Sequence, residues 1–448
     1  MTKKQRSFLF FLMVFLFIIA GPSIVFYSQG YRLDLQNKQI VKTGAFYFRV
    51  TPRSVQIEVS STDNERLKSA STDFIFGTAY VENLIPKNYK VKISKNDYHD
   101  WSKELEINEG MATEIKNITL ITKSPNFRVL KENVEDFFYF PENNLYIAKI
   151  INETEWSLLK YNQSGLYFSE IISFDLENEL IDIINLSDLN KIIIKADNYY
   201  LVDIEKENEI DVLDLPNDIL KISTHPKERE NLIFLKENNI YLYDFEEKTI
   251  SIFLENVIDY SLKNGFSWIS DEGFLLENIE NPEKINRTPI EIDEEKEYEI
   301  MNFNDKIIRI NDDYYLLDQE TLSFKHIFKS SETPVASPDS KKIAYSDGYE
   351  IKVLFLEGTD DHPQRNRLDN IFLTRFSNKL ENINWYTSHY LIFNISDDIK
   401  IIEIDNRNNI NIVDFAQFKE PKIHFNFPSK KLYILSEDTL FSSRQLIP

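Results

Sequence analysis

Most of this chain alternates short apolar and polar stretches, and one long apolar run stands apart from that pattern. Residues 8–27 hold no charged side chain over twenty consecutive positions. At ~1.5 Å of rise per residue, a helix of that length crosses the ~30 Å hydrocarbon core of a bilayer. The pattern predicts a transmembrane helix over residues 8–27, preceded by residues 1–7 and followed by a juxtamembrane linker over residues 28–43.

The charges beside the run predict its orientation. Lys3, Lys4 and Arg6 precede it, and basic residues beside a span favour the cytoplasmic side. The N-terminus is then cytoplasmic and the bulk of the chain extracytoplasmic. A cleaved signal peptide is the alternative, because residues 8–20 alone have the length of an h-region. The run continues to aromatic residues without a small-residue cleavage site, which favours an uncleaved signal anchor.

Beyond the run, alternation with a period of two predicts antiparallel strands that have one solvated face. Residues 46–50, 55–59 and 89–94 are clear examples, and Asn, Asp, Glu and Lys fill the turns between such runs. No segment after residue 27 keeps helical spacing for three turns. The sequence therefore predicts an all-β fold behind the N-terminal helix.

Residues 44–122 are predicted to form a small domain of six or seven strands. Within it, residues 76–98 and the strand at 101–107 resemble the PEGA domain. The resemblance rests on Gly77, Thr78, Pro86, Tyr89, Val91, Ile93 and Tyr98. It implies a compact β-sandwich of the kind found in bacterial surface and envelope proteins, with no catalytic residues assigned to it.

Tyr98 and Trp101 are the candidate ligand contacts of this domain. Two neighbouring aromatic rings form a surface on which a sugar stacks. The alternative interpretation is that both rings belong to the core or the edge of the sandwich, where aromatic side chains bury a large apolar area.

Residues 126–448 repeat one hairpin unit. Three copies end in a Tyr-Leu-x-Asp strand, at residues 200–203, 241–244 and 315–318. Unit starts at residues 145 and 431 with seven intervals give 286/7, or about 41 residues per unit, the period of a propeller blade. The repeat predicts a β-propeller, with eight blades favoured and seven as the alternative. The C-terminal strand near Leu440 is expected to pair into the first blade and close the ring.

One repeat carries a recognisable motif. Residues 337–345 resemble the S-P-D-G-K-x-I-A-Y hairpin of TolB-like and WD-like propellers, with Ser340 in place of the usual glycine. Proline fixes φ in such a turn, and the aspartate side chain caps it. A catalytic role for Ser337 and Asp339 would need a histidine in reach, and the repeat supplies none.

Composition excludes several classes of function. The chain has no cysteine, so it has no disulfide, thiolate zinc site or catalytic thiol. With 73 acidic against 51 basic residues, the formal net charge is −22 at pH 7. Nucleic-acid binding requires a basic surface, so no nucleic-acid partner is predicted.

No motif in the chain points to a cofactor. The six histidines share no metal-binding spacing, and no P-loop, Rossmann or G-x-S-x-G pattern occurs. Acidic pairs at residues 312–313, 360–361 and 397–398 lack the alternating ligands of a calcium loop, so we interpret them as solvated turns. We predict no catalytic residue, no cofactor and no metal.

These features together predict a single-pass membrane protein of the bacterial cell envelope with a binding or scaffold function. The membrane is one partner through the N-terminal helix, and the propeller would bind an envelope protein or a glycan; this function is argued from the fold. The alternative is a glycan-active enzyme with its catalytic site in the propeller funnel. Three or more carboxylates and an arginine in the funnel would favour the enzyme, and an apolar and mixed polar lining would favour the scaffold.

Overall fold

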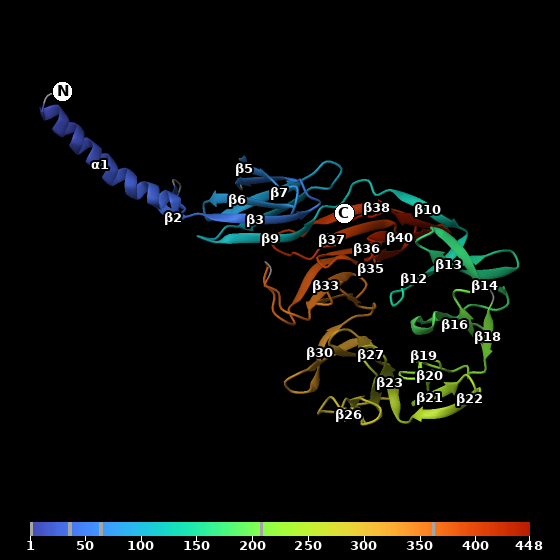
Figure 1. Ribbon diagram of the computed structural model, residues 1–448. Coiled ribbons are helices and arrows are strands. Elements are labelled where there is room, and N and C mark those ends of the chain that lie inside the picture. The colour runs from blue at the N-terminus through green and yellow to red at the C-terminus, as the bar shows by residue number, and fades with distance from the viewer. Residues whose placement is uncertain (1–2, 35–37, 62–65, 207–208, 361–362) are drawn as a thin grey trace.

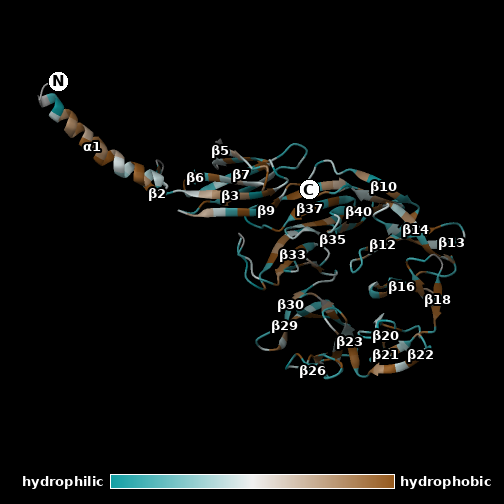
Figure 2. Ribbon diagram, viewed as in Figure 1, coloured by the Kyte–Doolittle hydropathy of each residue, from teal (hydrophilic) through white to brown (hydrophobic). Residues whose placement is uncertain are grey.

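An apolar helix opens the chain. The computed structural model describes residues 3–34, 38–61, 66–206, 209–360 and 363–448. Helix α1 (Lys3–Ser28) covers the predicted run, and Figure 2 shows it as an apolar rod that extends away from the rest of the molecule. It is long and apolar enough to cross a membrane, a test that a signal sequence also passes.

Two sheets follow α1 and the short hairpin β1 (Tyr31–Asp34) and β2 (Gln39–Lys42). One sheet has the order β6-β3-β9 and the other the order β5-β4-β7-β8. Their strands are β3 (Gly44–Thr51), β4 (Gln56–Ser61), β5 (Arg66–Ser71), β6 (Thr78–Leu84), β7 (Asn88–Ser94), β8 (Trp101–Glu106) and β9 (Ala112–Thr119). We call β3 to β9 the small domain.

Alternating side chains of both sheets form the core of the small domain. Phe46 and Phe48 of β3, Ile57 of β4 and Val91 of β7 are fully buried in one cluster. Every second residue of these strands faces inward, so the predicted alternation of apolar and polar residues along the strands is confirmed. The PEGA resemblance stays a prediction, as do the domain bounds 44–122 and 126–448.

The rest of the described chain is built from four-stranded antiparallel sheets. There are eight of them among the described residues, and one combines β10 with β39, β40 and β41. The first four consist of β11 (Val134–Phe140), β12 (Leu145–Ile151), β13 (Glu155–Asn162) and β14 (Tyr167–Asp175); β15 (Asp182–Leu186), β16 (Lys191–Lys195), β17 (Tyr199–Asp203) and β18 (Ile210–Leu213); β19 (Lys221–Thr224), β20 (Leu232–Lys236), β21 (Asn239–Asp244) and β22 (Thr249–Leu254); and β23 (Val257–Ser261), β24 (Ser267–Ser270), β25 (Leu275–Glu277) and β26 (Glu283–Lys284).

The other four sheets complete the ring seen in Figure 1. They consist of β27 (Tyr298–Asn302), β28 (Lys306–Ile310), β29 (Asp313–Asp318) and β30 (Ser323–Lys329); β31 (Val335–Ala336), β32 (Lys342–Ser346), β33 (Glu350–Phe355) and β34 (Asn370–Arg375); β35 (Leu380–Thr387), β36 (Tyr390–Ile395), β37 (Asp398–Glu403) and β38 (Ile412–Gln417); and β10 (Phe127–Glu132), β39 (Lys422–Asn426), β40 (Lys431–Ser436) and β41 (Thr439–Ser443). A single 3-10 turn, Ser187–Leu189, interrupts the strands in the described chain.

The first strands of neighbouring sheets lie against one another around the centre of the ring, for example β23 against β27 and β35 against β39. This radial arrangement is a β-propeller, and the all-β prediction is confirmed. The predicted hairpins are confirmed as well, since β16 pairs with β17, β20 with β21 and β28 with β29. If each sheet is taken as one blade, the count is eight, the interpretation that the sequence favours.

The ring closes in a different way from the one expected. Strand β41 pairs with β10, and β10 is the outermost strand of the sheet that holds β39 and β40. Strand β10, the first strand of the propeller, therefore joins the last sheet. We had expected the C-terminal strand to join the first sheet instead. Strand β10 comes directly after the small domain and lies far in sequence from β41. Its short polar-apolar pattern therefore does not indicate which sheet it completes.

A cluster of aromatic rings seals the joint between this closing sheet and the sheet of β11 to β14. His424 of β39 lies over Tyr139 at 4.1 Å between ring centroids, and Tyr146 lies over Tyr433 at 4.4 Å. Among the described residues, His424 Nε2 and the Tyr146 hydroxyl have no hydrogen-bond partner. Burial lowers the pKa of His424 to about 4, because a charged imidazolium would lose its hydration there.

We expect this joint to weaken in mild acid. The pKa of His424 is lower in the folded than in the unfolded chain, so its contribution to stability is complete above pH 6.5 and is lost as the pH falls toward 4. The loss reaches up to about 3 kcal/mol. Urea unfolding across this window should show a fall in the wild-type midpoint that is smaller in H424F, which keeps a ring but does not titrate. Parallel curves for the two proteins would contradict the assignment.

Candidate functional site

The small domain contacts the propeller through a buried ion pair. Lys103 of β8 places its Nζ 2.6 Å from Oε1 of Glu403, the last residue of β37, and the two side chains are 0% and 4% exposed. The same ammonium donates to the backbone carbonyls of Asp405 at 2.6 Å and Asn409 at 2.9 Å. Three acceptors therefore replace the water that Lys103 loses on burial.

The carboxylate of Glu403 is equally well satisfied. Its Oε2 accepts a hydrogen bond from Trp101 Nε1 at 2.7 Å, and its Oε1 accepts from the backbone and side-chain nitrogens of Asn411 at 2.9 and 2.7 Å. Burial raises the pKa of Glu403, and the adjacent Lys103 opposes that rise. Such a pair costs much desolvation, so its main effect is to admit one docking geometry of the two domains.

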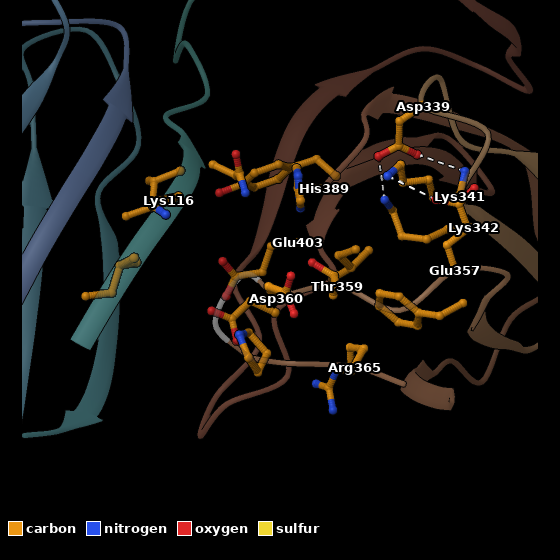
Figure 3. Close-up of a pocket in the computed structure, with 18 of the residues that line it drawn as sticks. Lys116, Asp339, Lys341, Lys342, Glu357, Thr359, Asp360, Arg365, His389 and Glu403 are labelled. Atoms are coloured by element: carbon orange, nitrogen blue, oxygen red, sulfur yellow. Dashed lines mark hydrogen bonds and ion pairs between the residues drawn. The ribbon is translucent and has the colours of Figure 1, made fainter. Parts of the chain in front are cut away.

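A cleft opens beside this contact, between strand β9 and the propeller (Figure 3). Its volume is about 440 Å³, within the size range of ligand sites. Four consecutive residues of β9 line one wall, and residues of β32, the loop after β33 and the ends of β36 and β37 line the other. The residues that line the two walls include Ile115, Lys116, Asn117, Ile118, Asp339, Lys341, Lys342, Phe355, Glu357, Thr359, His389, Tyr390, Glu403 and Ile404.

Five apolar or aromatic residues line the cleft and are themselves buried. Ile115 and Ile118 come from the small domain, and Phe355, Tyr390 and Ile404 come from the propeller; each is at most 6% exposed. The two walls touch where the Thr119 N–H donates to the Tyr390 hydroxyl at 3.2 Å. Both domains are needed to build this surface.

Two lysines of the propeller wall pair with neighbouring carboxylates. Lys342 Nζ lies 2.7 Å from Asp339 Oδ2, and Lys341 Nζ lies 3.0 Å from Glu357 Oε2. Burial alone would raise the pKa of Asp339, but hydrogen bonds from Lys342 and Ser337 hold it below its usual value. The charges of these two lysines are therefore compensated.

The S-P-D motif has the turn chemistry expected of it. Ser337 Oγ donates to Asp339 Oδ1 at 2.5 Å and accepts from the Lys342 backbone N–H at 3.0 Å. His389, which lies outside the repeat motif, lines the same cleft as Asp339. No sequence pattern indicates that proximity, because the two residues belong to different repeats of the propeller.

A second pocket of about 1010 Å³ lies beside the first strands β19, β23 and β27. It holds several carboxylates and Arg309, the combination that we expected of an enzyme funnel. These groups have partners in the fold: Arg309 pairs with Glu299 at 2.9 Å, and Asp259 pairs with Lys221 at 2.9 Å. Burial raises the pKa of Asp259, and Lys221 opposes it.

The candidate ligand contacts of the small domain lie near the domain contact. Trp101 is 3% exposed and donates its N–H to Glu403, while the partly buried Tyr98 packs against the core and bridges Thr122. Their stacking on a sugar stays a prediction. Within the described residues, no group of three His, Cys, Asp or Glu side chains could hold a metal ion; Asp361 and His362 lie outside them.

Sequence reasoning missed the two residues that build the site, Lys103 and Glu403. One signal was available for Lys103, which shares a face of its strand with Trp101 and Leu105. A charge inside an apolar stripe indicates a buried partner. Nothing in the pattern pointed to Glu403 as that partner.

Comparison with known proteins finds similar solved structures. No protein-family model and no curated protein matches the chain. The β-propeller domain of Cps50 (Swd1) from Myceliophteria_thermophila is 8% identical, with a TM-score of 0.41 over 71% of this chain and 99% of that chain. A eukaryotic initiation factor is 12% identical, with a TM-score of 0.45 over 73% and 90%. The WD40 domain of SCAP from fission yeast is 7% identical, with a TM-score of 0.42 over 72% and 98%.

No partner or activity is transferred from these proteins. The fold and the cleft define the class of this chain: a β-propeller protein that carries an N-terminal apolar helix and a two-sheet domain docked on the propeller.

We expect the K103A variant to loosen the docked domain. It leaves the Glu403 charge buried without its ammonium, which costs about 3–5 kcal/mol. The exposed linker residues Lys123 and Ser124 should be cut faster in limited proteolysis, and the unfolding midpoint should fall. K103M/E403L, which removes both charges, should recover most of the lost stability.

The matched control for K103A is K92A. Lys92 lies in the same domain and pairs with Asp100 at 2.8 Å, but the two side chains are 48% and 43% exposed. Its loss should cost less than about 1 kcal/mol. Equal proteolysis rates and midpoints for K103A and K92A would show that the buried pair does not hold the domains together.

Proposed function

We propose that this chain is a membrane-anchored, extracytoplasmic binding protein of the cell envelope, and that a partner binds in the cleft between the small domain and the propeller. The observation that carries the proposal is the composite cleft, which needs both domains and the Lys103–Glu403 contact to exist. A concave surface of this size, built by two domains, is suited to binding. The resemblance to envelope-associated PEGA domains and the apolar helix α1 support the location.

In this proposal α1 holds the protein at the membrane and the small domain acts as a rigid spacer. The propeller is then displayed in one orientation, because Lys103 and Glu403 fix it to the spacer. A fixed orientation reduces the entropy lost on binding, since neither wall of the cleft has to be ordered first.

A glycan-active enzyme is the second candidate, and the pocket beside β19, β23 and β27 is the observation that favours it. A carboxyl with a raised pKa, such as Asp259, is what a general acid in glycoside hydrolysis requires. The ion pair of Asp259 with Lys221 and its hydrogen bond from the Ile300 N–H at 2.7 Å favour a structural role for this carboxylate.

Cross-linking on intact cells tests the proposed function. A membrane-impermeant amine-reactive reagent is applied to cells that produce the full chain, the T359W variant or the Q319W variant. Thr359 lines the cleft, whereas Gln319 lies exposed in another sheet's hairpin. We expect the wild type and Q319W to be joined to a common partner and T359W to lose it, because the indole fills the cleft.

Two results would contradict the proposal. If the reagent does not reach the chain, the bulk of the protein is not extracytoplasmic. If T359W captures the same partner as the wild type, the partner binds elsewhere on the molecule.

A further inference from the structure

The end of the small domain next to α1 exposes three apolar side chains. Hairpin β1–β2 follows α1 directly (Figure 1), and it pairs Leu33 with Ile40 across its two strands. Directly opposite residues of a hairpin point to the same side, and Leu33 is 59% and Ile40 68% exposed. Met111, immediately before β9, is 59% exposed. We call Leu33, Ile40 and Met111 the apolar base.

Backbone hydrogen bonds attach the apolar base to the C-terminal end of α1. Gly30 lies two residues beyond the helix, and its carbonyl accepts from the N–H and the hydroxyl of Thr43 at 2.9 and 2.8 Å. Strand β3 begins at the next residue, Gly44, and the Ala45 N–H donates to the Met111 carbonyl at 3.0 Å. The hairpin, the start of β3 and Met111 therefore form one unit beside the end of the helix.

Arg32 ties the hairpin both to the helix and to the small domain. Its guanidinium lies 3.5 Å from the centroid of the Tyr27 ring and donates to the Tyr27 carbonyl at 2.8 Å. The same group donates to Asn83 Oδ1 of β6 at 2.6 Å. Phe26 of α1 packs edge-on against Tyr31 of β1, with 5.6 Å between the ring centroids. The hairpin is therefore held against the last turn of α1.

The surroundings of the apolar base match the boundary of a bilayer. Phe26 and Tyr27 are 54% and 65% exposed at the end of α1, and aromatic residues at the end of a membrane span lie at the level of the lipid headgroups. Lys42, in the strand that carries Ile40, is exposed as well, and a lysine in this position can reach lipid phosphates while its methylene groups stay in the apolar layer. The medium that would surround α1 thus also reaches the base.

Exposed apolar side chains at the other end of the small domain lie away from α1. Phe74, in the segment between β5 and β6, is 80% exposed. Strand β6 begins at Thr78, which is next to the partner of Arg49 in β3, whereas Gly44 lies at the α1 end of β3. Five residues of extended strand, or ~17 Å, separate Gly44 from Arg49. Phe74 therefore shares the exposure of the apolar base but not its place beside the helix.

We propose that the apolar base lies in the surface of the bilayer that α1 spans, with Leu33, Ile40 and Met111 inserted at the boundary between headgroups and acyl chains. This inference rests on the proposed function, because it requires α1 to lie in a bilayer, and it adds a second membrane contact. Interfacial elements of this kind enter ~5–10 Å into that boundary. The contact restricts the tilt of the small domain and, through Lys103 and Glu403, that of the propeller.

Spin labelling tests the proposal on the full chain, which has no cysteine of its own. The variants F15C, I40C, M111C and F74C are labelled one at a time and placed in phosphatidylcholine–phosphatidylglycerol nanodiscs that hold a single chain. Collisions of the label with oxygen, which concentrates among acyl chains, and with a polar nickel chelate, which stays in water, report the depth of each site. Phe15 lies within α1, and Phe74 is the matched control at the far end of the small domain.

We expect oxygen and not the nickel chelate to reach F15C, and the nickel chelate to reach F74C freely. I40C and M111C should show more oxygen collisions and several-fold fewer nickel collisions than F74C. Shielding by protein would lower both kinds of collision, so this combination identifies lipid. A single chain in each nanodisc excludes a second copy as the cover. An unchanged melting temperature shows that each variant is folded.

The results that overturn the inference are distinct from those that overturn the proposed function. Equal nickel collisions at I40C, M111C and F74C, or a fall in both oxygen and nickel collisions at I40C and M111C, would overturn the inference while F15C still reports an anchored helix. Nickel collisions at F15C as frequent as at F74C would show that α1 does not lie in the bilayer, and the proposed membrane anchor would then fail together with the inference.

Discussion

The buried contact between Lys103 and Glu403 is the constraint on which the arrangement of this molecule depends. Taking both charges out of water is expensive, and the cost is offset only in a geometry that gives each ion its full set of partners. Trp101, Asn411 and the carbonyls of Asp405 and Asn409 provide that set from two domains. A small rotation of either domain would leave a buried charge without its partners. The contact therefore selects one docking geometry and thereby defines the cleft.

Docking and ring closure are connected through a short stretch of chain. Leu120 belongs to the core of the small domain, and the next residue, Ile121, is buried with Tyr386 and Ile423 in the propeller. Strand β10 follows at Phe127 and completes the closing sheet beside β41. The same segment therefore leaves one domain, packs against the other and seals its ring. A propeller closed in this way has few exposed sheet edges. Strand β9, an edge strand of the small domain, lies at the cleft between the two domains.

Periodicity predicted the parts of this fold that depend on neighbours in sequence. Alternation at residues 46–50 and the Tyr-Leu-x-Asp hairpins gave the correct strands, because side-chain direction follows the backbone locally. Long-range pairing escaped the prediction: β10 joined the last sheet, and Trp101, expected at a core or on a sugar, bridges to a residue 302 positions away. The candidate site could not be predicted, since a buried ion pair is defined by two residues whose proximity only the tertiary fold creates.

If the buried ion pair joins the small domain and the propeller into one rigid unit, the distance between the two domains has a single value. The chain has no cysteine, so K90C and N378C introduce the two labelling sites on exposed positions of the two domains. Double electron–electron resonance on spin labels at these sites should give one narrow distance distribution. The distribution should broaden when K103A is added. A distribution that is already broad in the protein with Lys103 intact would contradict the account.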